Sequence, residues 1–229
     1  MNQIVTQGIM LARTDYGEAD RILTVLTPDR GKLRLIAKGV RRLKSKLAGG
    51  IELFSTCDLT YIPGRGEIGT LVSARLMHFY DHITGDINRT MLGYELIKLL
   101  HKATEDEPEP DYYHLLEQAF AALDNAVIGI DLIKLWFAAQ LLRLAGHMPN
   151  LQTEADGTKL VADQVYEFSF DDSAFMSRPD GSFGADDIKF LRVVFSGNIP
   201  AVLQKVSGVA ERVSRTRQLV WTLQQQYRG

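Results

Sequence analysis

The chain has 229 residues, of which 45% are hydrophobic and 24% are charged, and its formal net charge is −2. This composition is typical of a globular protein and excludes a fibrous or an intrinsically disordered chain. The single cysteine, Cys57, excludes an internal disulfide and a cysteine-based metal site. No apolar stretch is long enough to span a bilayer and no secretory signal is apparent, so we expect a cytoplasmic protein that does not enter a membrane.

The charge is unevenly distributed along the chain. Residues 1–80 contain 12 Lys/Arg and 7 Asp/Glu, a balance of +5, whereas the remaining residues contain 14 and 21, a balance of −7. Because the first third of the chain is basic and the remainder is acidic, we infer that one domain binds a polyanion while the rest has another role. The alternative is chance sorting of charges on a solvated surface.

The first third of the chain is patterned as short strands separated by turns. The expected strands cover residues 6–14, 21–27, 32–39, 51–63 and 70–80. Turn-forming residues such as "TPDRGK" (27–32) stand between them. Five short strands without a helix predict a small closed β-barrel.

Near residue 81 the spacing of apolar residues changes to that of helices. Helical spacing of apolar residues predicts helices over 87–103, 112–126, 131–145 and 185–197, and a last long helix that Pro200 opens. Residues 147–184 are polar, turn-rich and only weakly β-patterned. We therefore predict an α+β fold: a barrel domain over 1–80, then a helical domain over 81–229 with an irregular insertion at 147–184.

Residues suited to catalysis are scarce. The stretch "GRGEIG" (64–69) lacks the spacing of a dinucleotide-binding loop and introduces no helix, so a strand-connecting loop is expected. His78 and His82 are four residues apart but have no carboxylate partner at a suitable spacing. Cys57 lies in an apolar strand and is expected to be a packed core thiol. The sequence therefore predicts a protein that is not an enzyme.

The strongest feature is a basic segment, residues 30–46, which holds eight Lys/Arg and no acidic residue. Each Lys or Arg that meets a phosphate releases counterions, so such a segment gives salt-sensitive binding without base specificity. The alternative is an inert solvated loop. The residues expected to bind DNA phosphates are Lys38, Arg41, Arg42, Lys44 and Lys46, with Arg13 and Arg34 as further candidates if their side chains face outward.

Two other groups of residues could meet a ligand. Aromatic platforms for bases are scarce in the first 80 residues, and most of them are expected in the core or at the barrel rim; they are Tyr16, Phe54, Tyr61, Phe79 and Tyr80. Near the C-terminus a run of arginines forms either an ordinary solvated helix face or a second contact surface; it comprises Arg212, Arg215, Arg217 and Arg228.

Four stretches of the N-terminal region form a recognisable pattern: "YGEADRILTVLTPDRGK" (16–32), "AKGVRR" (37–42), "KSKLAGGIELF" (44–54) and "GTLVSARL" (69–76). In their order and spacing they resemble the RecO family of bacterial DNA-repair and recombination mediators. The resemblance implies an oligonucleotide-binding (OB-fold) barrel joined to a helical domain. It also implies a nucleoid-associated protein that binds single- and double-stranded DNA, anneals complementary strands and, with RecR, helps load RecA onto strands coated by single-strand-binding protein.

The implied partners are therefore RecR and the acidic, apolar C-terminal tail of single-strand-binding protein. We expect the tail to bind the helical domain, with Lys134 and Arg143 as candidates because they lie on its most apolar helix. Two alternatives remain, an OB-fold RNA-binding module and a protein adaptor without annealing activity.

The chain differs from many members of the family in the segment that follows residues 141–151. Many members of the family carry a four-cysteine zinc module after the stretch that reads "LLRLAGHMPNL" (141–151) here. In this chain "TEAD" (153–156) and "MSRP" (176–179) stand where the cysteine pairs would be. Because four thiolates close such a site and none is present, we predict no zinc and no cofactor. Apolar residues of the insertion would hold it instead.

Overall fold

The computed structural model describes residues 2–43, 45, 47–104 and 110–227. They form two compact units, Met1–Asn125 and Ala126–Gly229. The first unit holds the barrel and the three helices that follow it. Among the described residues, no helix combines the length and the apolar character that a membrane span requires.

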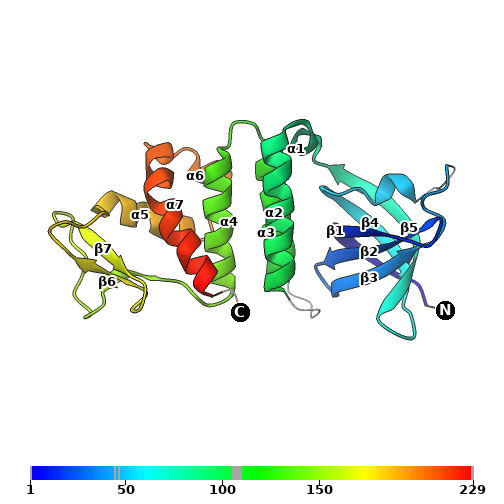
Figure 1. Cartoon of the computed structure of the whole chain (residues 1–229), viewed down its shortest axis with the longest axis horizontal. Helices are drawn as coiled ribbons and strands as arrows, with labels where there is room; N and C mark the ends of the chain where they lie inside the picture. Colours follow the sequence, from blue (N-terminus) through cyan, green and yellow to red (C-terminus); the bar gives the residue numbers. More distant parts are fainter. Residues whose placement is uncertain (1, 44, 46, 105–109, 228–229) are drawn as a thin grey trace. The chain divides into compact units, whose positions relative to one another are not determined.

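Five strands of the first unit close into a barrel (Figure 1). Their order around the barrel is β1-β2-β3-β5-β4; β4 pairs with β1 to close it, and β3 and β5 are parallel. The predicted five-stranded barrel is thus confirmed. The strands are β1 (Ile4–Tyr16), β2 (Asp20–Thr27), β3 (Gly31–Ala37), β4 (Ser55–Ile62) and β5 (Ile68–Phe79), with a short 3-10 helix, η1 (Ala48–Gly50), before β4.

Alternation along the strands fills the barrel interior. Leu23 and Val25 of β2, Leu35 of β3 and Leu59 of β4 are buried, while the residues between them face outward. Side chains in a strand point alternately to opposite faces, so this two-residue period places one apolar row inside the barrel. The same period places Ile22 and Thr24 of β2 and Arg34 and Ile36 of β3 on the outer side of the sheet.

Three helices follow the barrel in the first unit: α1 (Asp81–Gly85), α2 (Ile87–Ala103) and α3 (Pro110–Asp124). Helices α2 and α3 pack against each other. Phe54, just before β4, is buried and joins them to the barrel, because its ring meets those of Tyr94 on α2 and Phe120 on α3 at centroid distances of 5.1 and 5.5 Å. Its backbone is left-handed, with φ of 57°.

The second unit is built on a buried helix, α4 (Ile130–Leu144), with α7 (Val209–Gln226) packed along it. The other helices are α5 (Ala185–Phe195) and α6 (Pro200–Leu203). The prediction of one long helix from Pro200 is wrong, since α6 ends after one turn and α7 begins only after Gly208, whose φ is 69°. That left-handed residue interrupts the helical backbone.

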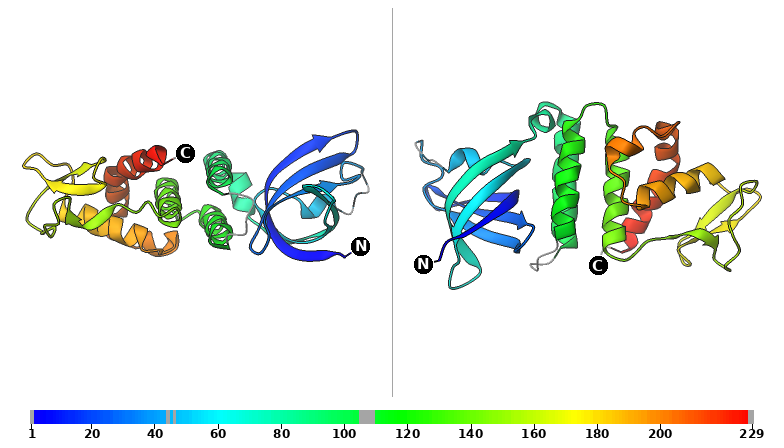
Figure 2. Two further views of the ribbon diagram at one scale, coloured as in Figure 1. Left: turned by 90° about the horizontal axis from the view of Figure 1, so that it is seen from below. Right: turned by 180° about the vertical axis from the view of Figure 1, so that it is seen from behind.

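The insertion is more regular than expected. It forms a three-stranded sheet in the order β6-β8-β7, seen from two further sides in Figure 2. The strands are β6 (Asn150–Glu154), β7 (Tyr166–Ser169) and β8 (Ala174–Ser177). Rings of Tyr166, Phe168 and Phe175 pack edge to face as its core. The Ser177 backbone N–H donates to Glu154 Oε2 at 2.7 Å and so joins the "TEAD" and "MSRP" stretches directly.

Candidate nucleic-acid interface

The outer face of β2 and β3 carries a cation. The strand register places Thr24 opposite Arg34 and Ile22 opposite Ile36, whereas the buried pair Leu23 and Leu35 lies on the inner face. Arg34 therefore points outward, which is the condition for it to be a DNA-binding candidate, and its side chain is 51% exposed. Its nearest acidic neighbour, Glu67 in the β4–β5 loop, is 3.6 Å away.

Arg13 does not reach this face. Its register partner is Leu23, which faces the barrel interior, so Arg13 follows the inner row. Arg13 Nη1 lies 2.7 Å from Glu52 Oε2 and also donates to the carbonyl of Ile51. The guanidinium thus ties β1 to the segment before β4, and the outward-facing condition set for Arg13 is not met.

The turn after β3 is anchored to the hairpin that joins β1 and β2. The Gly39 N–H donates to Asp20 Oδ1 at 2.7 Å, and the Arg41 N–H donates to the Ala19 carbonyl at 2.9 Å. Gly39 has a φ of 64°, a conformation that glycine adopts without a steric penalty. The turn presents Lys38 and Arg42 as exposed side chains.

Asp15 holds the guanidinium of Arg41. Arg41 Nη2 is 3.5 Å from Asp15 Oδ2, and Arg21 Nε donates to Asp15 Oδ1 at 2.9 Å. The hydrogen bond from Arg21 lowers the pKa of the Asp15 carboxyl below its usual value, and the charge of Arg41 adds to the effect. The carboxylate therefore fixes Arg41 and leaves it at the surface.

The structure thus brings Lys38, Arg41 and Arg42 together in the turn at one end of β3, and Arg34 lies in the middle of β3 on its outer face. Lys44 and Lys46 lie outside the described residues. No acidic residue stands in the sequence between Arg30 and Glu52, and the carboxylates that meet this turn, Asp15 and Asp20, come from the β1–β2 hairpin. Such a surface can bind phosphates without reading bases.

The barrel cysteine is not suited to nucleophilic chemistry. Cys57 is fully buried and lies 3.2 Å from the Gly8 carbonyl oxygen. Burial raises the pKa of its thiol to about 12, with a smaller contribution from Asp58. A thiolate is the reactive form, so this residue packs as an apolar side chain at neutral pH.

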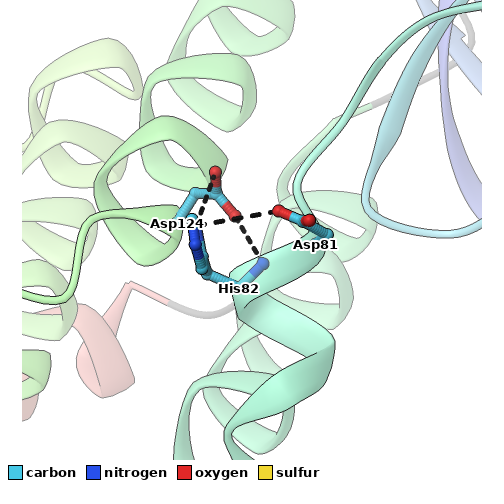
Figure 3. Close-up of side chains that lie close together, drawn as sticks. All are labelled: Asp81, His82 and Asp124. Atoms are coloured by element: carbon cyan, nitrogen blue, oxygen red, sulfur yellow. Dashed lines mark hydrogen bonds and ion pairs between the residues drawn. The ribbon is translucent and has the colours of Figure 1, made fainter.

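A histidine–carboxylate cluster lies where α1 meets the end of α3 (Figure 3). His82 has carboxylate neighbours that no sequence spacing indicated: its Nδ1 lies 3.5 Å from Asp124 Oδ2 and 3.7 Å from Asp81 Oδ1. Its backbone N–H also donates to Asp124 Oδ1 at 2.9 Å. These side chains could offer three ligand atoms to a metal ion, but the contacts already form a polar link between α1 and α3.

A pocket of about 250 Å³ lies between α4 and α7 in the second unit. The Lys134 ammonium is 4.3 Å from the centre of the Trp221 ring, and Arg217 pairs with Asp131 at 3.2 Å beside it. The pocket is lined by Asp131, Lys134, Leu135, Ala138, Arg217, Gln218 and Trp221. Arg143, the other candidate, does not line it and instead donates to Gln140 Oε1 at 2.7 Å.

Sequence reasoning named Arg217 as part of a possible contact surface but missed Trp221, which lines the α7 side of this pocket with it. The available signal was the spacing of Arg217 and Trp221, which are four residues apart and so share a helix face. The other arginines of α7 are structural: Arg212 and Arg215 both pair with the buried Asp187 of α5, at 3.2 and 3.0 Å. Arg228 lies outside the described residues.

Comparisons with known proteins match both halves of the chain. A family profile described as "Recombination protein O N terminal" matches residues 1–80, and one described as "Recombination protein O C terminal" matches residues 84–208. Among curated relatives, the DNA repair protein RecO of Dehalococcoides mccartyi is 32% identical over 70% of this chain and 64% of its own length. That of Bifidobacterium longum subsp. infantis is 36% identical over 64% of this chain and 62% of its own.

The corresponding protein of Rubrobacter xylanophilus is 32% identical over 64% of this chain and 58% of its own length. In all three relatives the match therefore spans less than two thirds of the relative.

Proposed function

Because the chain belongs to the RecO family of DNA repair proteins, we propose that it is a DNA-binding recombination mediator. In this proposal it anneals complementary strands and, with RecR, helps load RecA onto single-stranded DNA coated by single-strand-binding protein. It acts by binding and remodelling, without catalysing a bond change, in the cytoplasm and at the nucleoid. The activity and partners of the whole protein are proposals, since the matches cover only part of each relative.

The observation that supports DNA binding is the grouping of Lys38, Arg41 and Arg42 in the turn at one end of the barrel, with Arg34 on the outer face of β3. Complementary strands repel each other through their phosphates. Cations that bind both strands reduce this repulsion and lower the cost of bringing the strands together. Because counterion release drives such binding, annealing should weaken steeply as the salt concentration rises.

The test removes charge from the anchored turn. A Lys38→Ala/Arg42→Ala double variant should bind a single-stranded oligonucleotide more weakly at low salt, and the slope of log affinity against log salt should fall by about two. The matched control, Lys159→Ala/Lys205→Ala, removes two exposed cations from the second unit and should change neither quantity. Unchanged binding by the first variant would overturn the assignment of this surface.

The same assay separates DNA binding from the RNA-binding alternative. Oligonucleotides of equal length and sequence, one DNA and one RNA, are compared with the wild-type protein, and annealing of each complementary pair is followed by fluorescence quenching. The proposal requires binding and annealing of DNA. Binding of RNA alone, or binding of DNA without annealing, would favour the alternatives.

For the tail of single-strand-binding protein we propose the α4–α7 pocket. An acidic peptide with apolar side chains and a terminal carboxylate suits a site that combines the Trp221 ring with the charges of Lys134 and Arg217. Trp221→Ala and Lys134→Ala should each weaken binding of a synthetic tail peptide about tenfold, as expected for central interface residues. Arg143→Ala, a cation of the same helix outside the pocket, is the control; equal losses in all three variants would contradict the proposal.

A further inference from the structure

Among the five aromatic residues considered as base platforms in the barrel region, some are buried and others are exposed. Phe54, Tyr61 and Tyr80 are 1%, 5% and 5% exposed, so their rings cannot meet a ligand. Phe79 is 36% exposed but lies on β5 opposite Ser55 of β4, away from the β1–β2–β3 surface. Tyr16 is 54% exposed and ends β1.

The register of the sheet places Tyr16 on the outer face. Tyr16 is the partner of Asp20, and two residues before it Thr14 is the partner of Ile22. Ile22 in turn pairs with Ile36, on the outer face that also carries Arg34. Because side chains two residues apart in a strand share a face, Tyr16 continues this outer row to the tip of the hairpin.

The tip of the hairpin is also where the basic turn is anchored. Asp20, the register partner of Tyr16, accepts the hydrogen bond from Gly39. A Cβ on Gly39 would lie 3.6 Å from Arg42 Cδ, so the aliphatic stem of Arg42 passes close to Gly39. Tyr16 and Arg42 therefore border the same Asp20–Gly39 contact, and both side chains are exposed.

We propose that Tyr16 is a stacking platform for an unpaired base of the bound single strand, while Arg42 and Lys38 hold its phosphates. The inference rests on the proposed DNA-binding function and assigns a second chemistry to that surface. An exposed ring can stack on any base, because every base has a π-face. In a duplex the bases are stacked on one another, so the platform contributes to binding of single strands and not of duplexes.

The test separates the ring's contact with bases from contacts with phosphates. A thymidine oligonucleotide is compared with an abasic oligonucleotide of the same length, which has the same phosphates and no bases. Tyr16→Ala should lower affinity for the thymidine oligonucleotide by about fivefold to tenfold, the lower part of the range for base–aromatic stacking, and leave the abasic affinity unchanged. Arg42→Ala should lower both affinities.

Two conservative variants isolate the ring itself. Tyr16→Phe keeps the ring without the hydroxyl and should bind both oligonucleotides as the wild type does. Tyr16→Leu keeps apolar bulk without a π-face and should lose the same thymidine affinity as Tyr16→Ala. Unchanged affinity of the same variant for the abasic oligonucleotide excludes a loss caused by unfolding.

Three results would count against the proposal. Equal losses on the thymidine and abasic oligonucleotides would show that Tyr16 acts on the fold or on phosphates. Unchanged binding by Tyr16→Ala would remove the platform and leave the proposed function standing. Failure of the wild-type protein to bind either oligonucleotide would overturn the proposed function and the platform together.

Discussion

Gly93, in the middle of α2, faces the ring of Phe54 so closely that a Cβ at position 93 would lie 2.5 Å from Phe54 Cε1. Phe54 is buried and holds a left-handed backbone conformation that is costly for a residue with a bulky side chain. The missing side chain at Gly93 is thus what lets the ring enter between α2 and α3.

Gly93→Ala should destabilise the protein. In most helices this substitution stabilises by up to about 1 kcal/mol, but here the added methyl overpacks the contact with Phe54, so we expect the free energy of unfolding to fall by about 1–3 kcal/mol. Urea denaturation measures the change. Gly85→Ala, in α1 with no atom within 4 Å of the added Cβ, is the control and should cause no loss; equal stability of Gly93→Ala and wild type would contradict the packing argument.

Glu67→Gln should strengthen DNA binding. Glu67 is 87% exposed and 3.6 Å from Arg34, so its negative charge competes with an incoming phosphate for the guanidinium. Removing the charge should raise affinity for a single-stranded oligonucleotide roughly twofold to fivefold at low salt, the range of an exposed ion pair. Fluorescence anisotropy measures it, with Asp163→Asn as a charge control in the second unit; a decrease for Glu67→Gln would show that Arg34 does not contact DNA.

The contact between Asp15 and Arg41 should resist mild acid. The pKa of Asp15 is lowered from its usual 3.8 by Arg21 and then Arg41, so the folded state favours the carboxylate. The stabilisation is therefore fully present above pH 3.8 and is lost as the pH falls further, through the lowered pKa. NMR titration of the Asp15 carboxyl carbon should place its midpoint below that of Asp15 in the Arg21→Gln variant; a midpoint that is the same in both proteins would exclude this role for Arg21.

Cys57 should be inert until the barrel opens. With its thiol buried and its pKa raised to about 12, a maleimide at pH 7.5 should leave the native protein unlabelled and label it fully in guanidinium chloride. Mass spectrometry counts the adducts. Rapid labelling of the native protein would show that β4 opens under native conditions.

The sequence predicted the parts of the fold that depend on local periodicity. The pattern of short strands and turns predicted the barrel, and the alternation in β3 separated Arg34 from Leu35, but which of the two faces outward follows only from the closed barrel. The helices after residue 81 followed from apolar spacing, and the last one was misjudged because Gly208 interrupts a pattern that otherwise continues into α7.

What could not be predicted depends on pairs distant in sequence. Gly39 meets Asp20 across 19 positions, and His82 meets Asp124 across 42. No periodicity encodes such pairs, because they arise only when elements pack. Arg13 shows the same limit: the pattern assigned it to a strand, but the ion pair with Glu52 was visible only in the folded barrel.

The hydrogen bonds from Gly39 to Asp20 and from Arg41 to Ala19 have a consequence for the free energy of binding. Ordering the backbone of one residue costs about 1–2 kcal/mol of conformational entropy, and a loop that orders only when its ligand arrives adds that cost to binding. At residues 39 and 41 the backbone is already ordered in the folded protein, so binding does not add this entropy cost. A phosphate that reaches this turn therefore finds its backbone already ordered, and more of the electrostatic attraction remains as affinity.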